Sequence, residues 1–291
     1  MKISELYNKK FVVSFEIFPP KTAVGEEKLE YELGLLSANS PDFVSITYGA
    51  GGSTRNKTLK LALSIRDKYG ITPIIHFTCV GAGKDDIRSY IEEVKQSGIN
   101  NILALRGDPP VGETSFRAHP EGFKHADELI RFIRSIGDFT IAAAGYPEIH
   151  IEALSMEEDL INLKKKVDAG ADFIITQLFY DNNAFYEYMN NVARLGIDIP
   201  VVPGIMPITS RGQIKKLVEL SGTNIPSRLM KSLEACVSAE SEATVGLDFS
   251  VKQCVELKSW GVKGIHIYTM NKSYAVAEIM RGLGVKGNEK E

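Results

Sequence analysis

One pattern constrains the fold of this 291-residue chain more than any other: short apolar, β-branched runs alternate with helical patterns along its whole length. There are eight such runs, and most are continuously apolar, as expected for parallel strands covered by helices. We expect strands at Phe11–Ile17, Phe43–Tyr48, Ile74–Thr78, Asn101–Leu105, Thr140–Tyr146, Phe173–Leu178, Val201–Ile205 and Gly264–Thr269.

Between these runs, apolar residues recur at spacings of three and four, which is the pattern of an amphipathic helix. Ser155 and Glu158 have the spacing of a capping box at one helix start. Four glycines, at positions 70, 98, 170 and 196, are placed to end helices. We expect helices at Glu26–Ala38, Asn56–Tyr69, Lys84–Gln96, His125–Ile136, Ser155–Ala169, Ala184–Leu195, Arg211–Glu219, Ser227–Val237, Phe249–Trp260 and Ser273–Leu283.

Eight strand–helix units predict an α/β protein with a parallel sheet that closes into a (β/α)8 TIM barrel. Extra helices are expected between the seventh and eighth strands and at the C-terminus. A doubly wound sheet is the competing architecture, and it would require a reversal of strand order. No linker divides the chain, so we expect one catalytic domain over residues 1–285 and a disordered tail at 286–291.

Composition narrows the function class. Hydrophobic residues make up 44% of the chain, charged residues 24%, and the net charge is −3, which is ordinary for a globular protein and does not point to nucleic acid. No apolar stretch approaches the roughly 18 residues of a membrane helix, and Ser14 and Glu16 interrupt the N-terminal run, so we expect a strand there rather than a signal peptide. Three dispersed cysteines fit a reducing compartment, so we expect a cytoplasmic protein.

Polar residues gather where a barrel carries its chemistry, at the C-terminal ends of the strands. Glu16, His76 and Gln177 lie on expected strands, as do His266 and Tyr268. Further polar residues directly follow strands: Thr47, Tyr48, Arg106, Gly107, Asp108, Tyr146 and His150. The sequence therefore predicts an active site at this rim.

Each of these residues also has a structural interpretation. Glu16 lies among apolar residues, so desolvation would raise its pKa, as suits a general acid, or it could be the ion-pair partner of Arg106 or a lysine. A single histidine such as His76 on an apolar strand is more often a satisfied core group. The segment Arg106-Gly107-Asp108, followed by Pro109-Pro110, could be only a tight turn.

One helix carries a polar stripe. Asp159, Asn162 and Lys166 fall three and seven residues apart, with Lys165 beside them. Such a stripe is usually a solvated face, and the alternative is a contact with a ribose and a diphosphate.

Other catalytic chemistries find no support in the motifs. None of the five histidines forms an H-x-H or H-E-x-x-H pattern, so a metal site is not expected. No nucleophile motif is present, and the glycine-rich loop at residues 49–52 lacks the dinucleotide-binding spacing, so Ser53 or Thr54 is expected to cap the next helix. A polar rim without metal or nucleophile suggests a bound organic cofactor.

The rim motifs, taken together, resemble those of the methylenetetrahydrofolate reductase family, in its short bacterial form that consists of the catalytic barrel. The matching segments occur in order along nearly the whole chain: SFEIFPPK (14–21), SITYGA (45–50), ALRGD (104–108), AGYPEIH (144–150), KVDAGA (166–171), TQLF (176–179), PGIMP (203–207) and HIYTMN (266–271).

This resemblance implies an FAD-containing oxidoreductase of one-carbon metabolism and methionine biosynthesis. It would reduce 5,10-methylenetetrahydrofolate to 5-methyltetrahydrofolate in a ping-pong cycle with NADH or NADPH. It also implies a homo-oligomer. Positions matching FAD contacts are Tyr48, His76, Arg106, Gly107, Asp108, Tyr146, His150, Ala153, Asp159, Asn162, Lys165 and Lys166.

Further roles follow from the same resemblance. Glu16 matches the general acid that assists protonation of folate N10, and Asp108 matches a catalytic carboxylate near the flavin and the pterin. Gln177 matches a pterin contact and Thr47 a nicotinamide contact. Gln213 and Lys272 match folate contacts.

Three positions depart from the family pattern. Lys272 stands where better-known members carry arginine, Leu217 where a phenylalanine stacks on nicotinamide and folate, and His125 where a tyrosine lies near the adenine side of the cofactor. The electron donor therefore stays open. The alternatives are an FAD- and folate-binding subunit that receives electrons from a partner protein, and a flavin-free barrel such as a lyase or a pterin-binding transferase.

Overall fold

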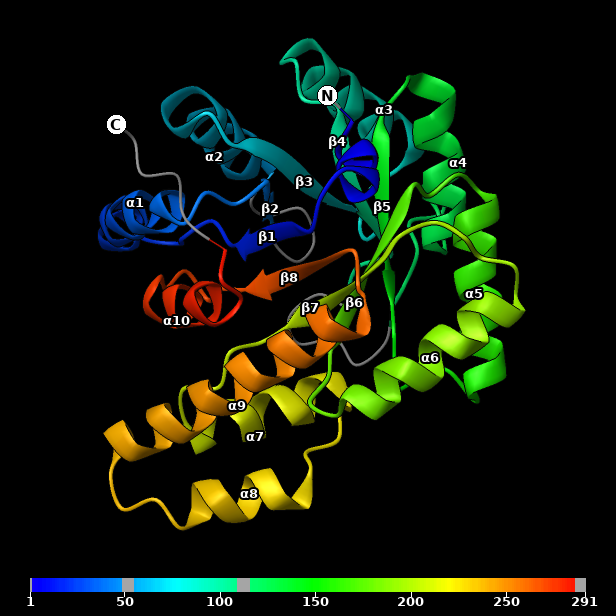
Figure 1. The fold of residues 1–291 in the computed structure, drawn as a ribbon. Coiled ribbons are helices and arrows are strands. Elements are labelled where there is room, and N and C mark those ends of the chain that lie inside the picture. Colours follow the sequence, from blue (N-terminus) through cyan, green and yellow to red (C-terminus); the bar gives the residue numbers. More distant parts are fainter. Residues whose placement is uncertain (1, 49–54, 109–115, 286–291) are drawn as a thin grey trace.

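The predicted barrel is confirmed. The computed structural model describes residues 2–48, 55–108 and 116–285, and within them eight parallel strands form a closed barrel in sequence order, with β1 paired to β8 (Figure 1). The strands are β1 (Val12–Ile17), β2 (Phe43–Ile46), β3 (Thr72–Thr78), β4 (Asn101–Leu105), β5 (Thr140–Gly145), β6 (Phe173–Leu178), β7 (Val201–Ile205) and β8 (Gly264–Tyr268). Their ends lie within two residues of the predicted ones, because each strand is a nearly continuous buried run.

The helices surround the barrel, as Figure 1 shows. They are α1 (Ala23–Ala38), α2 (Arg55–Tyr69), α3 (Lys84–Gln96), α4 (Ala126–Ile136), α5 (Met156–Asp168), α6 (Asn182–Arg194), α7 (Arg211–Ser221), α8 (Ser227–Glu234), α9 (Ala239–Trp260) and α10 (Tyr274–Gly282). All four glycines expected to end helices have a positive φ, of 68°, 76°, 109° and 66° in sequence order.

Helix α1 begins three residues earlier than predicted and α8 ends three residues earlier, and two further helical features differ from the prediction. Helix α9 begins at Ala239 rather than Phe249, because Ser238 caps it by accepting a hydrogen bond from the Ser241 N–H, while its first ten residues offer few apolar side chains to reveal a period. The capping box at α5 is only half formed. Ser155 accepts from the Glu158 N–H, but the Glu158 carboxylate accepts from Leu154 instead of the cap residue.

A short helix missed by the sequence analysis closes one end of the barrel. The 3₁₀ helix η1 (Ile3–Asn8) buries Ile3, Leu6 and Tyr7 in the same cluster as the inward-facing strand residues. The Tyr7 ring packs against Phe173 with centroids 5.3 Å apart. The barrel is therefore plugged at the N-terminal ends of its strands, and a cavity is confined to the opposite end.

The segment between β7 and β8 forms a helical layer of its own. Helices α7, α8 and α9 extend away from the barrel in Figure 1. They pack around a separate apolar cluster that includes Leu178, Ile208, Ile214 and Leu233. Among residues 2–48, 55–108 and 116–285, no helix is long and apolar enough to cross a membrane. The predicted tail at 286–291, the glycine-rich loop at 49–52 with Ser53 and Thr54, and Pro109-Pro110 lie outside the described residues.

Candidate active site

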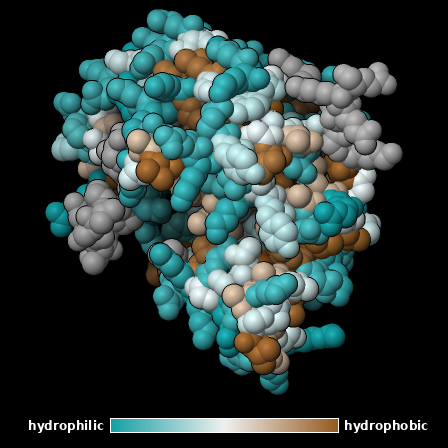
Figure 2. Space-filling view, turned by 90° about the vertical axis from the view of Figure 1, so that its left-hand side faces the viewer, coloured by the Kyte–Doolittle hydropathy of each residue, from teal (hydrophilic) through white to brown (hydrophobic). Residues whose placement is uncertain are grey.

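A cavity of about 870 Å³ opens at the C-terminal ends of the strands. Figure 2 views the molecule from the side towards which β1 and β8 point, and shows a recess with largely hydrophilic visible walls. Its lining comes from strands β1, β3 to β6 and β8, from the segments that follow β2 to β5, and from helices α4 and α5. This size lies at the upper end of the range for ligand pockets.

The structure brings most of the predicted site residues together in this cavity. Those lining it are Glu16, Thr47, Tyr48, His76, Arg106, Gly107, Asp108, His125, Tyr146, His150, Ala153, Asp159, Asn162, Lys165, Lys166 and Gln177. Because parallel strands of a barrel end at one rim, residues far apart in the sequence meet there. Their functional roles remain predictions.

Three predicted folate contacts do not line this cavity. The Gln213 amide is engaged near the start of α7, where its oxygen accepts from the Thr209 N–H and hydroxyl, both at 2.8 Å, and its nitrogen donates to Pro207. Leu217 packs into the apolar cluster beneath α7. Lys272 borders a second, largely apolar cavity of about 630 Å³ between α1 and the β8–α10 loop.

A buried cluster of three titratable side chains lies at the base of the main cavity. Glu16 Oε2 lies 3.4 Å from His76 Nε2 and 3.6 Å from His266 Nε2. His266 is fully buried and its Nδ1 is 2.7 Å from the Ser14 hydroxyl. Strands β1, β3 and β8 supply these residues, so the cluster exists only in the closed barrel.

The electrostatics of this cluster overturn one expectation, the raised pKa of Glu16. Burial raises the pKa of Glu16, but the hydrogen bond from His266 and the charges of His76 and His266 outweigh it, so the pKa lies below its usual value. The pKa of this carboxyl is therefore lowered overall, and not raised as predicted. Burial lowers the pKa of His76 to about 4, which leaves its ring neutral at pH 7.

The alternative interpretation of Glu16, as the ion-pair partner of Arg106, was wrong. Arg106 pairs instead with Glu152, through a two-point contact in which Nη2 lies 2.8 Å from Oε1, and its guanidinium lies over the Phe116 ring. His76 is not a satisfied core histidine either, since its Nε2 is buried and has no hydrogen-bond partner among the described residues. A buried nitrogen of this kind, facing a cavity, is available to a ligand.

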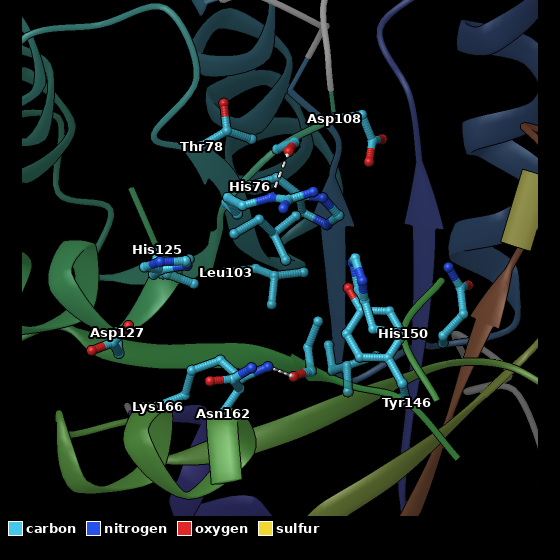
Figure 3. A pocket seen from close by; sticks show the side chains of 18 of the residues that line it. His76, Thr78, Leu103, Asp108, His125, Asp127, Tyr146, His150, Asn162 and Lys166 are labelled. Carbon is cyan, nitrogen blue, oxygen red and sulfur yellow. Dashed lines mark hydrogen bonds between the residues drawn. The ribbon is translucent and has the colours of Figure 1, made fainter. Parts of the chain in front are cut away.

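The chain turns sharply where β4 ends. Gly107 has φ +91°, and a Cβ there would lie 2.9 Å from Thr78 Cβ and 3.0 Å from Val80 Cγ1. Only glycine can adopt this backbone conformation so close to Thr78 and Val80 without strain. The turn places the Arg106 and Asp108 side chains at the cavity mouth, and Figure 3 shows Asp108 there above Tyr146 and His150.

Half of the polar stripe of α5 is buried: Asp159 and Lys166 are buried, whereas Asn162 and Lys165 are exposed, so the interpretation as a solvated face fails for the first two. Asp159 is 6% and Lys166 9% exposed, less than the apolar Ile161 of the same helix at 47%. Lys166 Nζ donates to the Ala144 carbonyl at 2.6 Å, and burial lowers its pKa to about 8. Burial raises the pKa of Asp159, whose Oδ2 accepts from the His150 N–H.

The two walls of the cavity differ in character. On one side the Tyr146 and His150 rings meet edge to face with centroids 4.6 Å apart, and His150 has a pKa lowered by burial and by Arg106. On the opposite side His125, the N-cap residue of α4, lies near Asp127, with Asn162 and Lys166 projecting from α5 below (Figure 3).

Several lining residues were missed by sequence reasoning, among them Thr78, Asp127, Arg131 and Glu152. Thr78 sits two residues after His76 on the same strand, so strand alternation could have placed it on the same face. Asp127 and Arg131 lie on the first turns of α4, which the barrel rule places at the same rim. The Thr78 hydroxyl is also buried without a hydrogen-bond partner in the described chain.

The fold and the cavity define a (β/α)8-barrel protein with a ligand site where barrel enzymes carry their chemistry. The chain belongs to the methylenetetrahydrofolate reductase family, whose model matches residues 2–284. It is 36% identical to the 5,10-methylenetetrahydrofolate reductase of Escherichia coli (strain K12), over 94% of this chain and 91% of that one. It is 39% identical to methylenetetrahydrofolate reductase (NADH) 1 of Arabidopsis thaliana, over 94% of this chain and 48% of that one. The chain thus spans about half the length of its plant relatives.

Solved structures agree on the fold. A Clostridium thermocellum protein that binds two copies of 5-methyl-5,6,7,8-tetrahydrofolic acid superimposes with a TM-score of 0.65 at 16% identity, covering 98% of this chain and 99% of that one. A 2,3-dimethylmalate lyase of the PEP mutase/isocitrate lyase superfamily gives a TM-score of 0.54 at 14% identity, covering 99% of this chain and 88% of that one. At these identities the likeness concerns the barrel alone.

Proposed function

We propose that this chain reduces 5,10-methylenetetrahydrofolate to 5-methyltetrahydrofolate with FAD as its cofactor. The observation that carries the proposal is the Glu16 carboxyl, held between His76 and His266 at the base of a cavity lined by every residue that matches a family FAD contact. Family membership and the folate bound by the Clostridium thermocellum barrel support the same substrate.

The cavity suits FAD in size and in the chemistry of its donors. Arg106, Lys165 and Lys166 offer positive charge to a diphosphate, and the Asp127 and Asn162 side chains offer hydrogen bonds to ribose and adenine. His76 Nε2 and Thr78 Oγ1 are buried polar atoms without a hydrogen-bond partner in the described chain, and a flavin ring edge would satisfy them. When bound, FAD supplies the redox chemistry, taking a hydride from a reduced donor and giving it to the folate in separate half-reactions.

Glu16 is the group that handles the proton. Ring opening of the substrate needs a proton at folate N10, which leaves a methylene iminium at N5 that accepts the hydride. Because the pKa of Glu16 is lowered, the carboxyl must gain its proton as the folate arrives, and His266, whose Nδ1 lies 2.7 Å from the Ser14 hydroxyl, is placed beside it to pass one on. A bound pterin that excludes water favours the neutral carboxyl.

Asp108 and Gln177 are proposed to hold the pterin, since both line the cavity and can pair with its amide and amine edge. Lys272 and Gln213 are proposed to meet the glutamate tail outside the main cavity. Lysine at position 272 offers a single point charge rather than a two-point clamp.

The donor is proposed to be NADH or NADPH, bound near Thr47. A second candidate, a protein electron donor, is favoured by one observation: Leu217 is partly buried against the apolar cluster of α7 to α9 and offers no aromatic face to a nicotinamide. A homo-oligomer stays a prediction from the family resemblance, and a cytoplasmic location stays a prediction from the sparse cysteines.

The test is an anaerobic visible spectrum of the purified protein, before and after NADH and then NADPH. Flavin bands bleached by either nucleotide support a self-sufficient reductase and identify its donor. Bands untouched by both, but bleached by dithionite and restored by 5,10-methylenetetrahydrofolate, support the protein-donor alternative. No flavin band after reconstitution with FAD contradicts the proposal.

A further inference from the structure

One pair of strands in the barrel is out of register at the cavity rim. Strands β6 and β7 pair at Ile175 with Val202 and again at Leu178 with Gly204. Between these pairs β6 contributes Thr176 and Gln177, whereas β7 contributes only Pro203. Proline has no N–H for the ladder, so an irregularity is expected opposite it. The extra residue makes this a β-bulge, a device that re-aims a side chain near an active site.

Side chains replace the ladder bonds that the bulge removes. The Gly204 N–H donates to the Thr176 hydroxyl oxygen at 3.0 Å. The Tyr268 hydroxyl, from β8, donates to the Thr176 carbonyl at 2.6 Å. Since β7 lies between β6 and β8, the tyrosine reaches across a whole strand to make this bond.

Gly204 makes the crossing possible. A Cβ at this position would lie 2.7 Å from the Tyr268 ring and 2.2 Å from the Thr176 carbonyl oxygen. Such contacts are too close for any side chain. Two residues of β7 therefore make room for the Tyr268 side chain. Pro203 donates no ladder hydrogen bond to β6, and Gly204 has no side chain at the place where the Tyr268 ring lies.

Gln177 is the residue that this arrangement presents to the cavity. Its side-chain oxygen accepts from the Leu178 N–H at 2.9 Å, and its carbonyl accepts from the Thr176 hydroxyl at 2.9 Å. The first contact holds the side-chain amide of Gln177, and the second holds its backbone carbonyl, so both tie Gln177 to the bulge. The side-chain NH₂ of Gln177 is left to donate a hydrogen bond. Any shift of Thr176 would thus move the Gln177 amide.

We propose that Tyr268 is a positioning residue, whose hydroxyl holds the Thr176–Gln177 bulge and so sets where the Gln177 amide meets the pterin of a folate. This inference rests on the proposed function, because it assigns Gln177 to the folate. Tyr268 also lines the cavity, so direct contact with the ligand is the competing explanation.

The test is a double-mutant cycle on the holoprotein, with the dissociation constant for 5-methyltetrahydrofolate measured by equilibrium dialysis. Tyr268→Phe leaves the Thr176 carbonyl without its partner and is expected to weaken binding about tenfold. In the Gln177→Ala background the same change is expected to weaken binding by less than about twofold, because the residue through which it acts is gone.

Two further variants strengthen the test. Thr176→Val removes the Thr176 hydroxyl and so disturbs the bulge without changing Tyr268. Its effect on folate binding should also disappear in the Gln177→Ala background, and this test stands even if Tyr268→Phe folds poorly. Tyr7→Phe is the matched control, since this buried hydroxyl has no partner in the described chain and lies at the plugged end of the barrel. Its binding should equal that of the unmodified protein.

The outcomes are distinct. Loss of the Tyr268→Phe effect in the Gln177→Ala background supports positioning through Gln177. Equal weakening in both backgrounds, or none in either, overturns it while leaving the proposed function intact. An unmodified holoprotein that binds no 5-methyltetrahydrofolate overturns the proposed function and this inference together.

Discussion

Glu16 and His76 come from strands that are not neighbours, yet the carboxylate oxygen and the imidazole nitrogen lie 3.4 Å apart inside the barrel. Neither group has an ordinary environment. His76 is neutral at pH 7, so the pair is not a full ion pair, and the carboxyl sits where a proton can be exchanged with a ligand.

Glu16→Gln should separate the two half-reactions of the proposed cycle. Reduction of the folate should fall by roughly 10²–10⁴-fold, because the amide cannot donate the proton that N10 requires. Flavin reduction by the nicotinamide needs no such proton and should change by less than about threefold. Rapid-mixing absorbance of each half-reaction checks this, with Glu92→Gln on the exposed face of α3 as control. Equal loss of both half-reactions would reject the acid role.

His76 should make the flavin-free protein sensitive to mild acid. Its folded-state pKa of about 4 lies below the usual 6.5, so the unfolded state binds more protons as the pH falls from about 6.5. The free energy of unfolding should therefore decrease by about 1–2 kcal/mol between pH 6.5 and 5. Urea unfolding should show this decrease in the unmodified protein and in the control His119→Gln, which lies outside the cavity. A decrease of the same size in His76→Gln would show that another group is responsible.

Lys166 should give a dependence of the same sign at alkaline pH. Its pKa of about 8 lies below the usual 10.5, so the unfolded state binds more protons above pH 8 and the stability rises with pH. Between pH 7.5 and 9.5 the free energy of unfolding should increase by about 1–2 kcal/mol from this group. Lys166→Met should lose that increase and should also bind FAD more weakly, since a cation near the diphosphate is gone.

For this pair of measurements the matched control is Lys164→Met on the same helix, a residue that does not line the cavity. Its pH dependence should equal that of the unmodified protein. An unchanged alkaline increase in Lys166→Met would mean that the ammonium is not the titrating group.

Glu152 is expected to compete with the cofactor for Arg106. Its carboxylate contacts the guanidinium, and this hydrogen bond lowers the pKa of Glu152 and raises that of Arg106. A diphosphate seeks the same cation. Glu152→Gln should therefore bind FAD a few-fold more tightly, and Arg106→Ala about tenfold or more weakly, in fluorescence-quenching titrations. Weaker FAD binding by Glu152→Gln would instead make Glu152 a support that holds Arg106 in place.

The barrel could be predicted because its strands are short buried runs and its helices have clear periods. Strand alternation and the barrel rule also placed Glu16, His76 and Gln177 at one rim. The family resemblance also assigned residues of α5 to the site. By spacing alone Asp159 and Lys166 look like part of a solvated face, but both are buried.

The remaining features depend on contacts between elements that the sequence does not pair. Nothing in the sequence connects Arg106 with Glu152, or shows that Glu16 meets two histidines from β3 and β8. The Tyr268 hydroxyl reaches Thr176 only because a proline and a glycine interrupt β7 between them. Each of these depends on tertiary geometry, which local propensity and spacing do not encode.

The proposed function requires that a cofactor held in this cavity passes a hydride to a folate. The most direct test is a single turnover: the flavin is reduced anaerobically with dithionite, excess reductant is removed, and 5,10-methylenetetrahydrofolate is added. The oxidised flavin bands should return, and 5-methyltetrahydrofolate should form in equal amount. A flavin that stays reduced, with the folate unchanged, would contradict the proposed function.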